Sequence, residues 1–105
     1  MGVFDERERG FEAGFKHDQE LRFRITVRRN RMLGLWAAER MGLVDELAHA
    51  YATDIVAAEF DGGDRRVIDK VCADLNATGQ TCSSAQIELE LTRLAKTAKQ
   101  QCMRE

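Results

Sequence analysis

The sequence of 105 residues contains no proline. Because proline removes a backbone N–H and breaks helices, only glycines and short polar clusters can interrupt a helix in this chain. Apolar residues make up 44% of the chain and charged residues 32%, which is typical of a globular protein with one core. Apolar residues recur at every third or fourth position, so the sequence predicts a single all-α domain.

Glycines mark the ends of the first two predicted helices. The first helix runs from about residue 16 to residue 40, and Gly42 supplies the left-handed residue that often follows a helix. The second helix starts with Asp45 as its N-cap and ends at the D-G-G-D turn, residues 61–64. Both helices are expected to bury one apolar face.

Polar residues open the last two predicted helices. Asp64 caps the third helix, which runs to Leu75, and a loop follows at residues 76–82. Ser83 and Gln86 then form the S-x-x-Q pattern of a capping box at the start of the fourth helix.

Residues 21–27, with the sequence LRFRITV, also fit a strand, because apolar and polar residues alternate there. No second alternating run exists to pair with such a strand, and a lone strand leaves its backbone groups unpaired. A helix is therefore the favoured prediction for this stretch.

Four helices with short connections predict a four-helix bundle over residues 20–105, preceded by a flexible arm over residues 1–19. The apolar periodicity gives the expected core: Leu21, Ile25, Met32, Leu33, Trp36, Leu47, Tyr51, Ile55, Val67, Val71, Leu91 and Leu94.

The three cysteines are Cys72, Cys82 and Cys102, and their spacing fits neither a disulfide framework nor a CxxC metal pair. They are expected to be reduced thiols in a cytoplasmic protein. The N-terminus lacks the apolar run of a secretory signal, and the most apolar window, residues 33–38, is too short to span a bilayer.

The sequence contains no pattern that predicts catalysis. His17 and His49 are 32 residues apart, and each is expected to be solvated or capping rather than a metal ligand. The acidic pairs at residues 5–6 and 45–46 suit the first turns of helices. Without a phosphate-binding loop or a nucleophile–base pair, the chain is not expected to be an enzyme, to hold a metal or to require a cofactor.

A basic stretch lies between acidic regions: residues 21–40 carry a charge of +5, and residues 1–20 and 41–75 carry −3 and −5. Three interpretations remain open for this stretch. It could pair with the acidic regions, bind nucleic-acid phosphates, or bind an adenine nucleotide stacked on Trp36. The residues concerned are Arg22, Arg24, Arg28, Arg29 and Arg31.

The N-terminal arm carries phenylalanines in a polar context. In a helix, Phe4, Phe11 and Phe15 would form one stripe, because steps of seven and four return to the same face. Gly10 and Gly14 each weaken a helix by about 1 kcal/mol, which favours an unfolded arm in isolation. Folding on a partner and folding back onto the bundle explain this pattern equally well.

The sequence resembles a known family over its whole length. The similarity is dense through the motifs RER, HDxEL, RRNR and LGxWAA, and it is weaker after Ala77. These motifs at fixed offsets identify the chain as similar to the zeta subunit of the alphaproteobacterial F-type ATP synthase, a family also described as a domain of unknown function.

The resemblance implies a regulatory inhibitor of ATP hydrolysis. In this family a four-helix bundle carries a mobile N-terminal segment, which becomes helical in a catalytic αβ interface beside the γ subunit and blocks hydrolytic rotation. The implied partners are the α, β and γ subunits of the catalytic head, and ADP or ATP bound by the bundle. The implied protein is a cytoplasmic monomer when free. It is peripheral to the inner membrane through the synthase and does not insert into the membrane or bind nucleic acid.

The resemblance also assigns the inhibitory interface to the arm. Gly10 and Gly14 stand where alanine-like residues are expected, which raises the cost of ordering the arm by about 2 kcal/mol. The implied inhibitory residues are Phe4, Asp5, Arg7, Glu8, Arg9, Phe11, Glu12, Phe15, His17 and Asp18.

Overall fold

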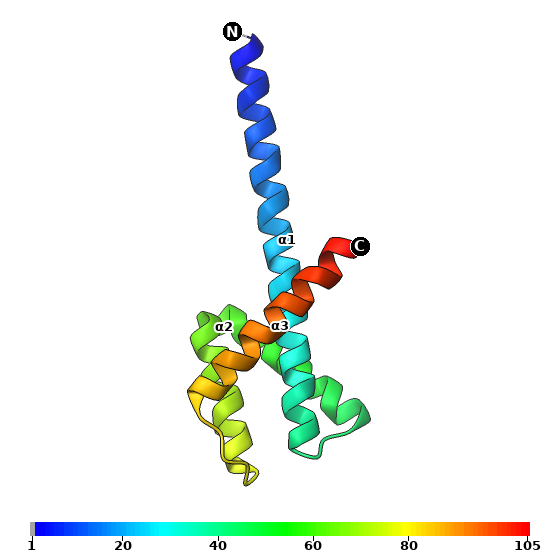
Figure 1. Ribbon diagram of the computed structural model, residues 1–105, viewed down its shortest axis with the longest axis vertical. Helices are drawn as coiled ribbons and strands as arrows, with labels where there is room; N and C mark the ends of the chain where they lie inside the picture. The colour runs from blue at the N-terminus through cyan, green and yellow to red at the C-terminus, as the bar shows by residue number, and fades with distance from the viewer. Residues whose placement is uncertain (1) are drawn as a thin grey trace.

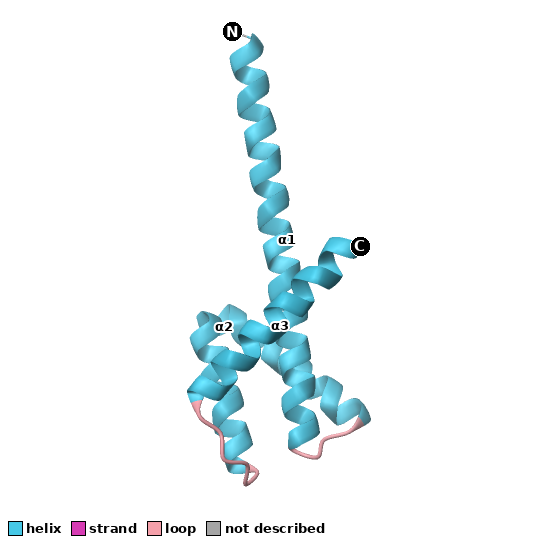
Figure 2. Ribbon diagram, viewed as in Figure 1, coloured by secondary structure: helices cyan, strands magenta, loops and turns pink. Residues whose placement is uncertain are grey.

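The computed structural model describes the backbone of residues 2–105 and the side chains of residues 17–105. Within residues 2–105 there are three helices and no strand: α1 (Gly2–Arg40), α2 (Asp45–Ala77) and α3 (Ser84–Arg104) (Figures 1 and 2). The prediction of an all-α fold is confirmed. The helix favoured over a strand at residues 21–27 is also confirmed.

Helix α1 has 39 residues, which corresponds to about 58 Å at 1.5 Å per residue. Its N-terminal part projects away from α2 and α3, and the N-terminus lies at the far end of the molecule (Figure 1). The molecule measures 64 × 24 × 21 Å. The flexibility predicted for residues 1–19, and the division into an arm and a bundle, stay predictions, because most of these side chains lie outside the described residues.

The end of α1 confirms the role predicted for Gly42. This residue has a φ of +80°, its N–H donates to the Glu39 carbonyl at 3.1 Å, and the Leu43 N–H donates to the Ala38 carbonyl at 2.9 Å. These two bonds form a Schellman motif, which requires a left-handed residue after the helix. The same pattern ends α2 at Gly79, whose φ is +89°.

Helix α2 corrects the prediction of four separate helices. The D-G-G-D segment is a kink inside α2, where only Gly62 and Gly63 depart from helical angles. Gly63 has φ +69° and ψ −160°, a conformation that a glycine adopts without strain. The break predicted at residues 61–64 is therefore present as a kink between two helical segments of α2, but the structure has three helices, and a four-helix bundle is not supported.

The N-cap prediction for Asp45 is wrong by one residue. The Val44 carbonyl accepts the first helical bonds of α2, from the N–H groups of Leu47 and Ala48, so Val44 is the N-cap. Asp45 is the first helical residue and has a φ of +52°. At the start of α3, by contrast, the predicted capping box of Ser83 and Gln86 is present.

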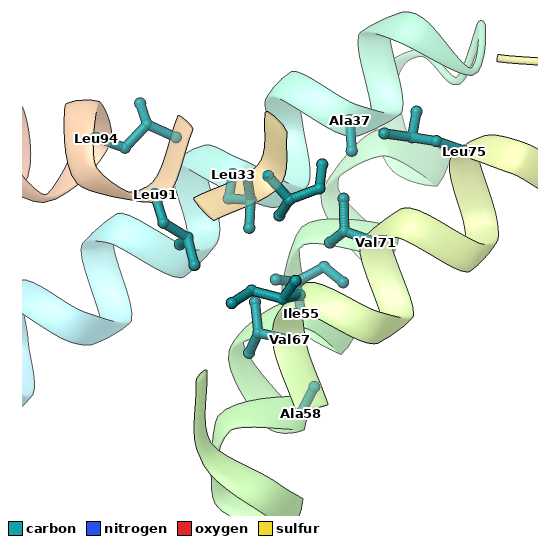
Figure 3. Packing of buried hydrophobic residues seen from close by; sticks show 11 residues of the cluster. Leu33, Ala37, Ile55, Ala58, Val67, Val71, Leu75, Leu91 and Leu94 are labelled. Carbon is teal, nitrogen blue, oxygen red and sulfur yellow. The ribbon is translucent and has the colours of Figure 1, made fainter. Parts of the chain in front are cut away.

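The core lies where the three helices meet, below the projecting part of α1 (Figures 1 and 3). Six predicted core residues are buried: Leu33, Ile55, Val67, Val71, Leu91 and Leu94. Met32, Trp36 and Tyr51 pack partly buried against them, and Leu21 and Ile25 are half-buried. The prediction for Leu47 is wrong, because 65% of its surface is exposed.

Gly34 allows α1 and α2 to pack closely. A Cβ atom at this position would lie 2.6 Å from the Cα of Ala52, which is closer than real Cβ atoms approach a backbone atom. The absence of a side chain therefore sets the distance at which α1 crosses α2.

Candidate interaction site

Only the end of the predicted inhibitory interface has described side chains. His17 and Asp18 are exposed on α1, as are the next two residues. The predicted residues from Phe4 to Glu12, and Phe15, have side chains outside the described residues. Their role in an interface therefore stays a prediction.

Burial along α1 begins well after these positions. Residues 21–29 are exposed or half-buried, and Asn30 is the first fully buried residue in the described part of α1. The described part of α1 therefore has a mostly exposed stretch, residues 17–24, a half-buried stretch, residues 25–29, and a stretch from residue 30 that packs in the core.

Polar contacts attach α1 to α2 where burial begins. The Asn30 Nδ2 donates to Glu59 Oε2 at 2.9 Å, and the Asn30 Oδ1 accepts from Arg29 Nε at 3.0 Å. The Arg29 guanidinium lies 2.7 Å from Asp64 Oδ1 and 3.4 Å from Glu59 Oε2. We call these four residues the α1–α2 polar cluster. Glu59 precedes the kink of α2 and Asp64 follows it, so the helical segments on both sides of the kink are attached to α1.

The cluster shifts two acidic groups in opposite directions. Burial raises the pKa of the Glu59 carboxyl above its ordinary value, and the neighbouring Asp64 carboxylate adds to this effect. The Arg29 guanidinium lowers the pKa of Asp64. The structural role of Asn30 was not predicted from the sequence, although an asparagine inside a run of arginines distinguishes this position from its neighbours.

The four residues predicted to bind a nucleotide do not share one set of contacts in the structure. Arg28 forms an ion pair with Glu105 at the end of α3, and Arg29 contacts α2. Arg31 is exposed, and Trp36 is half-buried with the Arg40 guanidinium 4.5 Å from its ring centroid. Arg28 and Arg29 are therefore engaged within the molecule, and nucleotide binding stays a prediction.

A pocket of about 260 Å³ lies beside Trp36 and Arg40 and extends to residues of the α2–α3 connection, including Cys82. Cys72, Cys82 and Cys102 form no disulfide in the structure of residues 17–105. His17 and His49 are both exposed. Among the side chains of residues 17–105, no group of three or more His, Cys, Asp or Glu is arranged to hold a metal ion.

In the part of the chain that the structure describes, no helix has both the length and the apolar character needed to cross a membrane.

The structure also brings together two exposed aromatic rings, those of Phe23 and Phe60. The sequence did not predict this pair, because the two residues are 37 positions apart.

Comparisons with known proteins agree with the resemblance seen in the sequence. A family model described as ATPase inhibitor subunit zeta matches residues 1–101. A solved structure, described as a solution NMR structure, is 33% identical to this chain. It aligns with a TM-score of 0.69, over 80% of this chain and 96% of that one. The comparison with curated proteins gave no match. Since the family model spans nearly the whole sequence, the chain belongs to the ATPase inhibitor subunit zeta family.

Proposed function

We propose that this chain inhibits ATP hydrolysis by inserting residues 1–19, as a helix, into a catalytic αβ interface of the F-type ATP synthase beside the γ subunit. Membership of an ATPase inhibitor family supports the inhibitory role and an association with an ATP synthase. The insertion mechanism, the particular subunits and the residues of the arm are the proposal.

The observation that supports this proposal most strongly is the projection of α1. The part of the helix before about residue 20 extends beyond α2 and α3 (Figure 1), and the side chains of residues 17–20 are exposed. Eighteen helical residues, from Gly2 to Gln19, span about 27 Å. A segment of this length can enter a cleft while the core stays outside.

The inner part of α1 provides a fixed base for this segment. Leu33 and Ala37 are fully buried, and the α1–α2 polar cluster attaches the same helix to both sides of the α2 kink. A load on the projecting segment is therefore transmitted along one helix into the core.

Inhibition by such a segment requires no catalytic chemistry. A helix that binds one conformation of the αβ interface more tightly than the next resists the rotation that would convert the first into the second. Each 1.4 kcal/mol of difference in binding free energy corresponds to about a tenfold preference. Rotation in the opposite direction opens the interface and releases the helix, so ATP synthesis is affected less than hydrolysis.

The alternative interpretation, nucleic-acid binding by the basic stretch, has less support. Of its five arginines, Arg28 pairs with Glu105, and Arg29 pairs with Glu59 and Asp64. These pairs neutralise charges that a phosphate backbone would otherwise contact. Pairing with acidic residues of the same chain therefore explains the presence of Arg28 and Arg29 in the basic stretch.

The proposal is tested by measuring ATP hydrolysis by the cognate catalytic head with increasing amounts of the full chain or of residues 20–105. The full chain is expected to inhibit, and the truncated chain is expected to lose inhibition entirely. The truncated chain should keep the helical circular dichroism and cooperative unfolding of its three-helix core. Undiminished inhibition by a folded truncated chain would refute the assignment of activity to the arm.

A further inference from the structure

Phe23 of α1 and Phe60 of α2 form an exposed aromatic pair. Their ring centroids are 5.8 Å apart with the planes tilted by 50°, and the two residues are 53% and 69% exposed. Single apolar side chains on a surface are common, but adjacent large rings beside a groove are typical of a binding surface.

The rings border a groove of about 240 Å³ between α1 and α2. The polar atoms at its base are already satisfied, because Asn30 donates to Glu59 and Arg29 is close to the same carboxylate. We call this surface the aromatic groove; it is lined by Arg22, Phe23, Thr26, Val27, Asn30, Val56, Glu59 and Phe60. Its free binding capacity is therefore mainly apolar.

The rim of the groove has basic character. Arg22 lines it, and Arg24 is exposed one residue beyond Phe23. Neither arginine forms an ion pair with a side chain of residues 17–105. The acidic lining residue, Glu59, is engaged by Asn30 and Arg29. An apolar groove with an unengaged cation at its edge fits a partner segment that carries an apolar side chain next to an acidic one.

The position of the groove connects it to the projecting segment. Phe23 follows Asp18, the last residue of the predicted inhibitory interface, by five positions on the same helix, which is about 8 Å along the axis. Any surface that encloses α1 up to Asp18 therefore comes within reach of the aromatic groove.

We propose that the aromatic groove is a second docking site for the ATP synthase head, which receives an apolar side chain flanked by an acidic one at the mouth of the interface that takes the arm. This inference rests on the proposed function and deepens it. The arm blocks rotation, and the groove adds affinity and fixes how far the helix enters.

The test compares the full chain with the double variant F23S/F60S in the hydrolysis assay. Removing two rings near the centre of a contact is expected to raise the concentration needed for half-inhibition by about tenfold or more. Complete inhibition should still be reached at saturation, because the arm is unchanged. The variant Arg22→Glu should weaken inhibition as well, and its defect should be larger at low ionic strength.

The matched control is L47S/L89S, which removes two exposed apolar side chains (65% and 74% exposed) from other surfaces of α2 and α3. Its potency should stay within about twofold of the original chain, since surface substitutions outside a contact have small effects. Circular dichroism of each variant verifies that the helices are intact.

Wild-type potency of F23S/F60S and of Arg22→Glu would overturn the groove proposal, even where deletion of residues 1–19 abolishes inhibition. A free chain that sediments as a dimer, with F23S/F60S a monomer, would assign the groove to a second copy and would also overturn it. Full inhibition by residues 20–105 would instead refute the proposed function itself, so the two failures are distinguishable.

Discussion

At the scale of single residues, the contact between Asn30 and Glu59 explains how a polar group is accommodated in the core. Asn30 has no exposed surface, yet its amide nitrogen and oxygen both have partners. A buried amide without partners costs about 1–3 kcal/mol, so these bonds make asparagine tolerable here. The accompanying disadvantage is a half-buried carboxylate, whose pKa is raised by desolvation.

This carboxylate leads to a prediction on pH and stability. Because the pKa of Glu59 is higher in the folded chain, the folded state binds this proton more tightly, and stability falls as the pH rises through that pKa. Glu59→Gln keeps an oxygen that accepts from Asn30 and removes the titration. Between pH 4 and pH 7, the free energy of unfolding of the variant should therefore rise relative to that of the original chain. Urea unfolding followed by circular dichroism measures this difference.

Asp64 changes the stability with pH in the opposite direction to Glu59. Arg29 lowers the pKa of Asp64, so the stabilisation from this carboxylate is present above pH 4 and is lost as the pH falls further. Measurements at pH 4 and above leave this contribution largely in place. Glu39→Gln, at an exposed site on α1, is the control. A fall in the relative stability of Glu59→Gln from pH 4 to pH 7 would contradict the interpretation.

At the scale of helices, local signals were predictable from the sequence and the continuity of α2 was not. Gly42 and the Ser83–Gln86 capping box depend on a few adjacent residues, so their patterns were sufficient. The break at Gly62–Gly63 was predictable from the same kind of local signal, but the absence of a loop between the two segments of α2 was not. Ile55 before the kink and Val67 after it enter the same core.

In the candidate site, too, features that depend on adjacent residues were predictable, and features that depend on contacts between helices were not. The exposed positions of His17 and Asp18 follow from the polar pattern around them. The aromatic groove was not predictable, because Phe23 and Phe60 meet only when α1 crosses α2. Leu47 fits the helical period of α2, but it lies in the first turn of that helix and is exposed.

A prediction for α1 concerns the two glycines in its outer part. Alanine at Gly10 and Gly14 lowers the cost of a helix by about 1 kcal/mol at each position. If residues 1–19 must be helical to inhibit, G10A/G14A should tighten inhibition by up to about thirtyfold. Half-inhibitory concentrations in the hydrolysis assay, together with the helical circular dichroism of the free chain, measure the two effects.

The reverse substitution at an adjacent position is the control for this prediction. Ala13→Gly adds a glycine between the existing two and should weaken inhibition by about fivefold. Unchanged potency in both variants would indicate that the helicity of the arm does not limit binding.

At the scale of the whole molecule, α1 links a compact core to a projecting segment in a particle 64 Å long. All three helices contribute buried residues to the core. In the described part of α1, the first buried residue is Asn30. Composition and periodicity predicted a helical domain, but they left two explanations of the arm equally open: folding on a partner and folding back onto the bundle. The family resemblance, which the match over residues 1–101 confirms, supplied the inhibitory role.

The proposed mechanism requires residues 2–19 to be the part of the chain that enters the catalytic head. Amide hydrogen exchange of the full chain, free and in complex with the cognate head, measures this directly. Exchange across residues 2–19 is expected to slow strongly in the complex, while the amides of the buried parts of α2 and α3 should exchange as in the free chain. Unchanged exchange across residues 2–19 in a fully inhibited complex would contradict it.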